Sequence, residues 1–90
     1  MPDLIYTESY IKKATKFIKK HPDLLRQYEK TLKLLEKNPY HPSLRLHKLE
    51  GNLSGVYSIS INTVYRITLE LIIDKDNIIL INVGKHEEVY

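Results

Sequence analysis

The first half of the chain carries hydrophobic residues at helical spacing. A first stripe, between residues 8 and 20, consists of Tyr10, Ile11, Ala14, Phe17 and Ile18. A second stripe consists of Leu24, Leu25, Tyr28, Leu32 and Leu35. Both stripes have the periodicity of amphipathic helices. Thr7 is a possible N-cap of the first helix. The second helix is expected to begin around Pro22-Asp23 and to end at Asn38-Pro39. Two helices with so short a connection are expected to lie antiparallel and to share one packing surface.

The second half has the alternation of β-strands. Segments rich in β-branched and aromatic residues predict strands at residues 46–50, 56–61, 65–73 and 78–83, and residues 4–6 predict a short strand before the first helix. Turn-forming residues occupy positions 51–55 and 74–77. The pattern therefore predicts four or five strands.

The parity of the strand residues separates an apolar face from a polar one. Tyr57, Ile59 and Ile61 share one side of their strand, and Tyr65, Ile67 and Leu69 share one side of the next. If residues 62–64 form an odd-length connection, both apolar sets face the same side and Ser60 lies opposite Arg66. We therefore predict an α+β fold, in which an N-terminal helical hairpin packs on one face of a four- to five-stranded, mainly antiparallel sheet. The other face stays open for chemistry or binding.

Length and composition narrow the class of protein. Ninety residues, 42% of them hydrophobic, suit one domain spanning residues 1–90. The absence of cysteine excludes disulfides, thiolate zinc sites and cysteine nucleophiles, and favours a reducing compartment. The longest uncharged apolar run, residues 78–81, is far too short to span a bilayer, and the N-terminus has no secretory pattern. We expect a cytoplasmic protein without a membrane partner.

Charge is distributed unevenly between the two halves. Residues 1–50 hold eleven cations against six anions, whereas residues 51–90 hold three against five. The lysines of the helical half suit a polyanion or an acidic partner. An ordinary solvated helix surface is the alternative that charge alone leaves open.

The chain lacks the common catalytic motifs. It contains no phosphate-binding glycine loop, no G-x-S-x-G, no H-E-x-x-H and no calcium loop, so no cofactor is expected. A sparse set of polar residues remains among the strands: His47, Lys48, Glu50, Arg66, His86, Glu87 and Tyr90. Histidine titrates near neutral pH and arginine binds phosphoryl oxygens, so two histidines and an arginine can cleave RNA without a metal.

Each of these residues also has a simpler interpretation. His47 and His86 can be strand histidines without function, and Arg66 can form a surface ion pair with Glu70. His41, His47 and His86 lack the tight spacing and the neighbouring carboxylate of a zinc site, so no metal is expected. Tyr90 is the better candidate than Tyr57 for stacking on a base, because Tyr57 falls on the apolar face.

Two segments resemble a known family. LEGNLSGVYSISIN at residues 49–62, followed by YRI at 65–67, resembles the central hairpin of the RelE/ParE superfamily of bacterial toxins. GKHEEVY at residues 84–90 is similar to the tail of its YafQ branch. The order of elements is also that of the superfamily, so the resemblance covers essentially the whole chain.

This resemblance implies a type II toxin. Such a toxin is an endoribonuclease that enters the ribosomal A site, cuts the bound mRNA and is held inactive by a cognate antitoxin. By this resemblance, His47 falls where the YafQ branch has a histidine and the YoeB branch has a carboxylate base. Arg66 falls on the arginine that stabilises the scissile phosphate in the family. His86 falls on a C-terminal histidine, which is a candidate general acid. Tyr90 matches a C-terminal aromatic residue. The implied RNA-binding residues are Lys48, Ser58, Ser60 and Lys85.

The sequence departs from the family at some positions. Many relatives have basic residues where this chain has Ser58, Ile59 and Ser60, and YafQ members have a further histidine and aspartate near Ser60 and Val64. Fewer cations imply weaker attraction of RNA phosphates. Two alternatives follow from other classes of protein: a ParE-like toxin that poisons DNA gyrase without nuclease chemistry, and a non-catalytic domain that binds an antitoxin or RNA. The latter predicts that His47 and His86 tolerate alanine.

Overall fold

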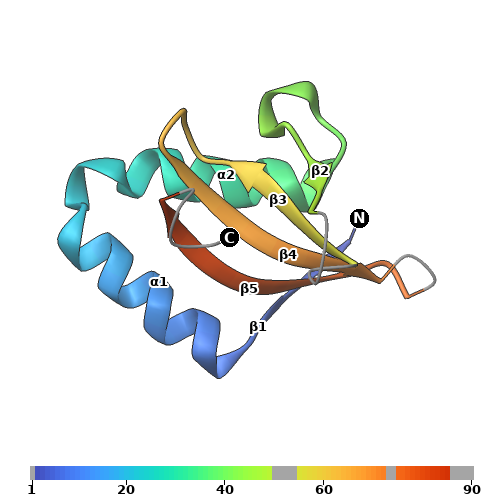
Figure 1. Cartoon of the computed structure of the whole chain (residues 1–90), viewed down its shortest axis with the longest axis horizontal. Coiled ribbons are helices and arrows are strands. Elements are labelled where there is room, and N and C mark those ends of the chain that lie inside the picture. The colour runs from blue at the N-terminus through green and yellow to red at the C-terminus, as the bar shows by residue number, and fades with distance from the viewer. Residues whose placement is uncertain (1, 50–54, 73–74, 86–90) are drawn as a thin grey trace.

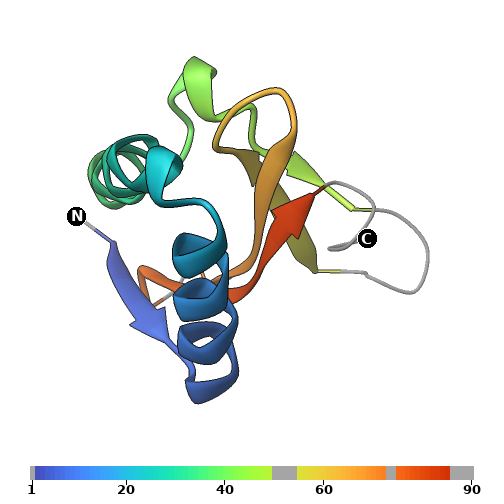
Figure 2. The ribbon, with the colours of Figure 1, turned by 90° about the vertical axis from the view of Figure 1, so that its left-hand side faces the viewer.

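Five strands form one mixed sheet, and two helices cover one of its faces (Figures 1 and 2). The computed structural model describes residues 2–49, 55–72 and 75–85. The strands are β1 (Asp3–Tyr6), β2 (His47–Lys48), β3 (Val56–Ser60), β4 (Tyr65–Ile72) and β5 (Asn77–Lys85), and the helices are α1 (Glu8–Lys20) and α2 (Leu25–Lys37). The predicted fold class is confirmed. Within these described ranges, neither helix is long and apolar enough to cross a membrane.

Local signals set the ends of the helices. The Thr7 side chain accepts a hydrogen bond from the backbone N–H of Tyr10 (3.1 Å) at the start of α1. Pro22 then begins a 3₁₀ turn, Pro22–Leu24, so α2 starts at Leu25, three residues later than Pro22. In Figure 2 α1 stands upright whereas α2 is seen almost end on. The helices therefore cross at a steep angle and not antiparallel, because the 3₁₀ turn redirects the chain between them.

The sheet order is β1-β5-β4-β3-β2. β1 lies parallel to β5, with Leu4 opposite Ile78, and all other pairs are antiparallel. The turn between β3 and β4 is held by the Asn62 side chain, whose Oδ1 accepts from the N–H groups of Val64 and Tyr65, both at 2.9 Å. The Ile61 N–H donates to the carbonyl oxygen of Tyr65 (2.9 Å), which leaves residues 62–64 as the loop. Ser60 therefore lies opposite Arg66, as the parity of the strands predicts.

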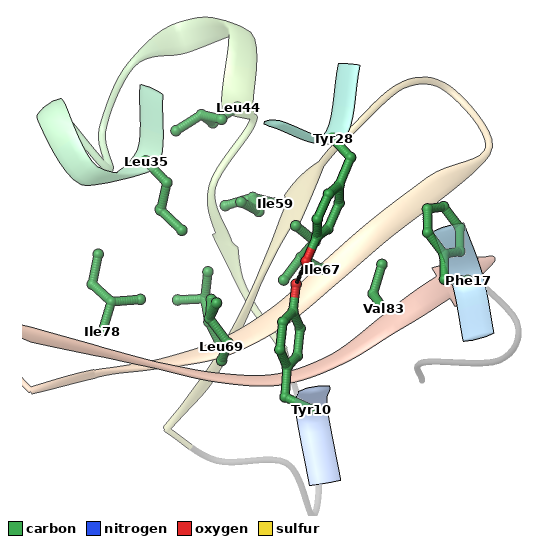
Figure 3. Close-up of a cluster of buried hydrophobic side chains, with 11 residues drawn as sticks. Tyr10, Phe17, Tyr28, Leu35, Leu44, Ile59, Ile67, Leu69, Ile78 and Val83 are labelled. Carbon is green, nitrogen blue, oxygen red and sulfur yellow. Dashed lines mark hydrogen bonds between the residues drawn. The ribbon is translucent and has the colours of Figure 1, made fainter. Parts of the chain in front are cut away.

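The core fills the space between the helices and the sheet (Figure 3). Its buried residues are Tyr10, Phe17, Tyr28, Leu35, Leu44, Ile59, Ile67, Leu69, Ile78, Leu80 and Val83. Ile11 and Leu25, members of the predicted stripes, remain 49% and 41% exposed. Each helix buries only the strip that meets the sheet, so residues at the flank of a stripe stay in solvent.

Two tyrosine hydroxyls meet inside this core. The Tyr10 and Tyr28 oxygens lie 2.7 Å apart, and Figure 3 shows the two rings joined end to end between α1 and α2. Burial raises the pKa of both phenols above the ordinary value of 10.0, so both stay neutral at physiological pH. The pair therefore ties the two helices together by a neutral hydrogen bond.

We expect Tyr28→Phe to lower the free energy of unfolding by about 1–2 kcal/mol, because it leaves the fully buried Tyr10 hydroxyl without a partner. The double variant Tyr10→Phe, Tyr28→Phe should cost less than the sum of the two single variants, since no orphan hydroxyl remains. Urea denaturation of the four proteins measures this coupling. Strictly additive losses would show that the hydroxyl pair contributes nothing.

Candidate active site

One face of the sheet points away from the helices (Figure 2), and by strand register it carries rows of polar residues. Directly paired residues of antiparallel strands point to the same face. One row is His47, Ser58, Thr68 and Asn82, one residue from each of β2, β3, β4 and β5. The adjacent row is Ser60, Arg66 and Gly84. Pairing between strands therefore brings together residues that are far apart in the sequence.

Arg66 lies at the centre of this polar face. It is half-buried, and its Nη1 donates a hydrogen bond to the Ser60 hydroxyl, which draws the guanidinium from β4 over β3. Arg66 and Glu70, which are both described, form no ion pair with each other. The Nε atom is buried, and it has no hydrogen-bond partner among the residues that the structure describes. A buried N–H without a partner is costly, so Arg66 retains a donor that an anionic ligand can satisfy.

His47 stands at the edge of the same face, on the two-residue strand β2. Its ring is exposed, and Nδ1 lies 3.1 Å from the carbonyl oxygen of Arg45. Because a carbonyl oxygen only accepts, this contact places the proton of the neutral ring on Nδ1 and makes Nε2 the basic nitrogen. Arg45 itself adopts a left-handed backbone with φ of 52°, which positions that carbonyl. The local backbone thus fixes the orientation of the His47 ring.

The strand register sets the separation of the two residues. β2 and β4 flank β3, so His47 and Arg66 lie about 10 Å apart across the strands and about 7 Å apart along them. An arginine side chain that leans over β3 shortens this gap on the β2 side. A phosphodiester placed over β3 therefore has the guanidinium on one side and the imidazole on the other.

Two hydroxyls of the first row are buried. Ser58 is 0% exposed and Thr68 is 2% exposed, and the Ser58 Oγ has no hydrogen-bond partner among the described residues. Ser60 is also buried, with its hydroxyl on Arg66. The geometry thus assigns Ser60 to the support of Arg66, and it places Ser58 beneath the surface between His47 and Thr68.

The remaining predicted site residues are not all on this face. Lys48 pairs with Tyr57 and Lys85 pairs with Tyr65, so by register both belong to the face that carries the helices. His86 and Tyr90 lie outside the described residues, as does Glu50. Within residues 2–49, 55–72 and 75–85, no group of three or more His, Cys, Asp or Glu residues is placed to hold a metal ion.

Asn82 is a residue of the polar row that the sequence pattern missed. It falls inside the nearly continuous apolar run of β5, where parity gives no clear face. A register shift between Thr68 and Leu69 then pairs Asn82 with Thr68. The one signal in the sequence was a polar residue inside an otherwise apolar strand.

Comparison with known proteins shows what this architecture resembles. The chain matches no family model, and no curated protein matches it in sequence. Among solved structures, a mutant of YafQ from E. coli superposes with a TM-score of 0.82 at 18% identity, over 100% of this chain and 99% of that chain. YafQ in the E. coli DinJ-YafQ toxin-antitoxin complex gives 0.78 at 18% identity, over 99% and 97%.

A YoeB/ParE toxin from Agrobacterium tumefaciens gives a TM-score of 0.76 at 14% identity, over 93% of this chain and 98% of that chain. At these identities the similarity concerns the backbone, and it extends over nearly the full length of each protein. The resemblance read from the sequence is thus confirmed at the level of the fold. The chain has the RelE-like fold of the YafQ and YoeB/ParE toxins.

Proposed function

We propose that this chain is the toxin of a type II toxin-antitoxin system and that it cleaves mRNA in the ribosomal A site. The proposal is carried by Arg66, which is fixed on Ser60 and lies on the same sheet face as His47. Its buried Nε has no hydrogen-bond partner in residues 2–49, 55–72 and 75–85. The RelE-like fold of the whole chain supports it. An arginine fork and an oriented imidazole are the groups that phosphodiester cleavage by acid-base chemistry requires.

The proposed reaction uses the RNA's own 2′-hydroxyl. Nε2 of His47 takes the proton of that hydroxyl, and the 2′-oxygen attacks the neighbouring phosphorus. Arg66 stabilises the charge that develops on the phosphoryl oxygens. His86 protonates the 5′-oxygen as the phosphorus–oxygen bond breaks, which leaves a 2′,3′-cyclic phosphate and a 5′-hydroxyl. Tyr90 positions the RNA, whereas Lys48 lies by register on the opposite face and is not assigned a role at the cleaved phosphate. The chemistry of the catalytic side chains needs neither a metal nor a cofactor.

A cognate antitoxin is the proposed protein partner. YafQ is known in complex with DinJ, and the present chain shares the YafQ fold. The excess of cations in residues 1–50 suits an acidic partner as well as RNA. The ribosome holds mRNA in the geometry for cleavage, so the isolated protein is expected to cut free RNA poorly. Such a toxin acts in the cytoplasm, where translation occurs.

Induction in a bacterial host tests this proposal. We expect the wild-type chain to arrest growth and to produce codon-phased 5′ ends in translated mRNA, and a His86→Ala, Arg66→Ala double variant to do neither. Both proteins are first compared by thermal denaturation, to show that the variant is folded. Arrest with a DNA-damage response but no mRNA cuts would identify a gyrase poison, and no arrest at all would identify a binding domain.

A further inference from the structure

A second concave site lies on the helix side of the sheet, between α1 and the carboxyl end of β5. It has a cavity volume of about 370 Å³. Its rim carries Lys13, Lys16 and Lys20 of α1, and its apolar wall includes Phe17, His21 and Tyr65. Within the described part of the chain, no carboxylate lines this groove. The groove is therefore cationic at its rim and aromatic within.

The three lysines form one row. Positions 13, 16 and 20 are spaced i, i+3 and i+7 and fall on one face of α1, about 4.5 and 6 Å apart along the helix axis. All three side chains are exposed. No acid lines the groove beside this row among the residues that the structure describes, and such a row attracts a chain of regularly spaced anions, such as the phosphates of a nucleic acid strand.

The rings make one continuous aromatic wall. The ring centroids of Phe17 and Tyr65 lie 5.2 Å apart, and those of His21 and Tyr65 lie 4.9 Å apart. Phe17 is buried, whereas His21 and Tyr65 keep part of their surface accessible at the groove. Proteins that bind single strands combine a positive groove with aromatic rings on which bases stack. An acidic peptide would satisfy the lysines but would leave the ring faces unused.

The groove is close to the candidate active site. Tyr65 and Arg66 are consecutive residues of β4, so their side chains point to opposite faces at the same end of the sheet. Lys85, which pairs with Tyr65 and also lines the groove, occupies that end. A strand of RNA that contacts Arg66 on one face can therefore continue around this end into the groove.

We propose that the groove between α1 and β5 binds single-stranded RNA, with one base against Tyr65 and His21 and the adjoining phosphates on Lys13, Lys16 and Lys20. The identity of the ligand rests on the proposed function, which supplies RNA as the substrate. The groove extends the RNA contact beyond the phosphate that is cleaved. Binding to it is independent of cleavage, since none of these residues belongs to the proposed catalytic set.

Fluorescence anisotropy with the full chain and a labelled, fully 2′-O-methylated RNA octamer tests this proposal, because that RNA cannot be cleaved. At about 0.15 M salt we expect the double variant Lys16→Gln, Lys20→Gln to bind the RNA about 5- to 20-fold more weakly than wild type. The slope of log affinity against log salt concentration should become shallower by about 1.4. Tyr65→Leu should weaken binding about fivefold or more and leave the slope unchanged. The matched control is Lys30→Gln, Lys33→Gln on α2, which removes the same charge and should change affinity less than about twofold.

Three results would overturn the proposal. The first is an equal loss in the α2 control, which would mean unspecific attraction to the net charge. The second is unchanged binding by the groove variants, with their thermal stability intact. The third is tighter binding of an octaglutamate peptide than of the RNA, which would make the groove a protein-binding surface. If the groove binds RNA but mRNA is not cut in cells, the inference stands and the proposed nuclease activity fails.

Discussion

Replacing Arg66 by alanine is expected to reduce mRNA cleavage on translating ribosomes by about 10²- to 10³-fold. The guanidinium is held by Ser60 and keeps a buried donor for the phosphate. A donor that is already in place when charge develops lowers the barrier without reorganisation, so its loss appears in the chemical step. Single-turnover cleavage of mRNA in a reconstituted ribosome complex measures this rate directly.

Two further variants identify the cause of that loss. Arg66→Lys keeps the positive charge but loses the fork of donors, so its rate should remain at least about tenfold below wild type. Arg26→Ala removes an arginine from the exposed surface of α2 and should leave the rate unchanged. Equal losses in Arg66→Ala and Arg26→Ala would reduce the role of Arg66 to net charge and would contradict the proposed mechanism.

The second large effect concerns stability. We expect Ile67→Ala to lower the free energy of unfolding by about 2–5 kcal/mol. Ile67 is 0% exposed on β4, a central strand, where its neighbours cannot close the space that the lost atoms leave. For a domain of this size, whose total stability is only about 5–15 kcal/mol, such a loss unfolds a substantial share of the molecules at elevated temperature. Equilibrium denaturation in urea measures it.

Ile11→Ala provides the matched control. It deletes the same atoms from a residue that is 49% exposed on α1, where alanine also favours the helix. We expect a change of less than about 0.5 kcal/mol. If the two variants lost similar stability, Ile11 would belong to the core, as the helical stripe in the sequence suggests, and the packing of α1 described above would be wrong.

The contrast between these two isoleucines illustrates what periodicity predicts. The spacing of apolar residues predicted both helices and every strand to within a few residues, because a helix turn and a strand pleat are local repeats. It did not predict which flank of the stripe meets the sheet. That choice depends on the crossing angle of the helices, which a 3₁₀ turn at Pro22–Leu24 sets.

In the candidate site too, the sequence predicted some contacts and missed others. Strand parity placed Ser60 opposite Arg66, since a three-residue turn fixes the register of a hairpin. It did not place His47 beside Ser58, or Asn82 in the same row, because those pairings depend on a two-residue edge strand and on a register shift in β4 and β5. The roles of His47 and Arg66 came from the family resemblance and stay a proposal.

The sequence by itself determined the elements, the apolar and polar faces of the hairpin, and the uneven charge of the two halves, because each is a property of neighbouring residues. Only the tertiary structure decided that β1 lies parallel to β5, that Arg66 leans on Ser60, and that lysines of α1 face Tyr65 across a groove. These contacts join segments that are distant in the chain. Their geometry depends on how the helices and the sheet pack together, and a local sequence pattern does not predict that packing.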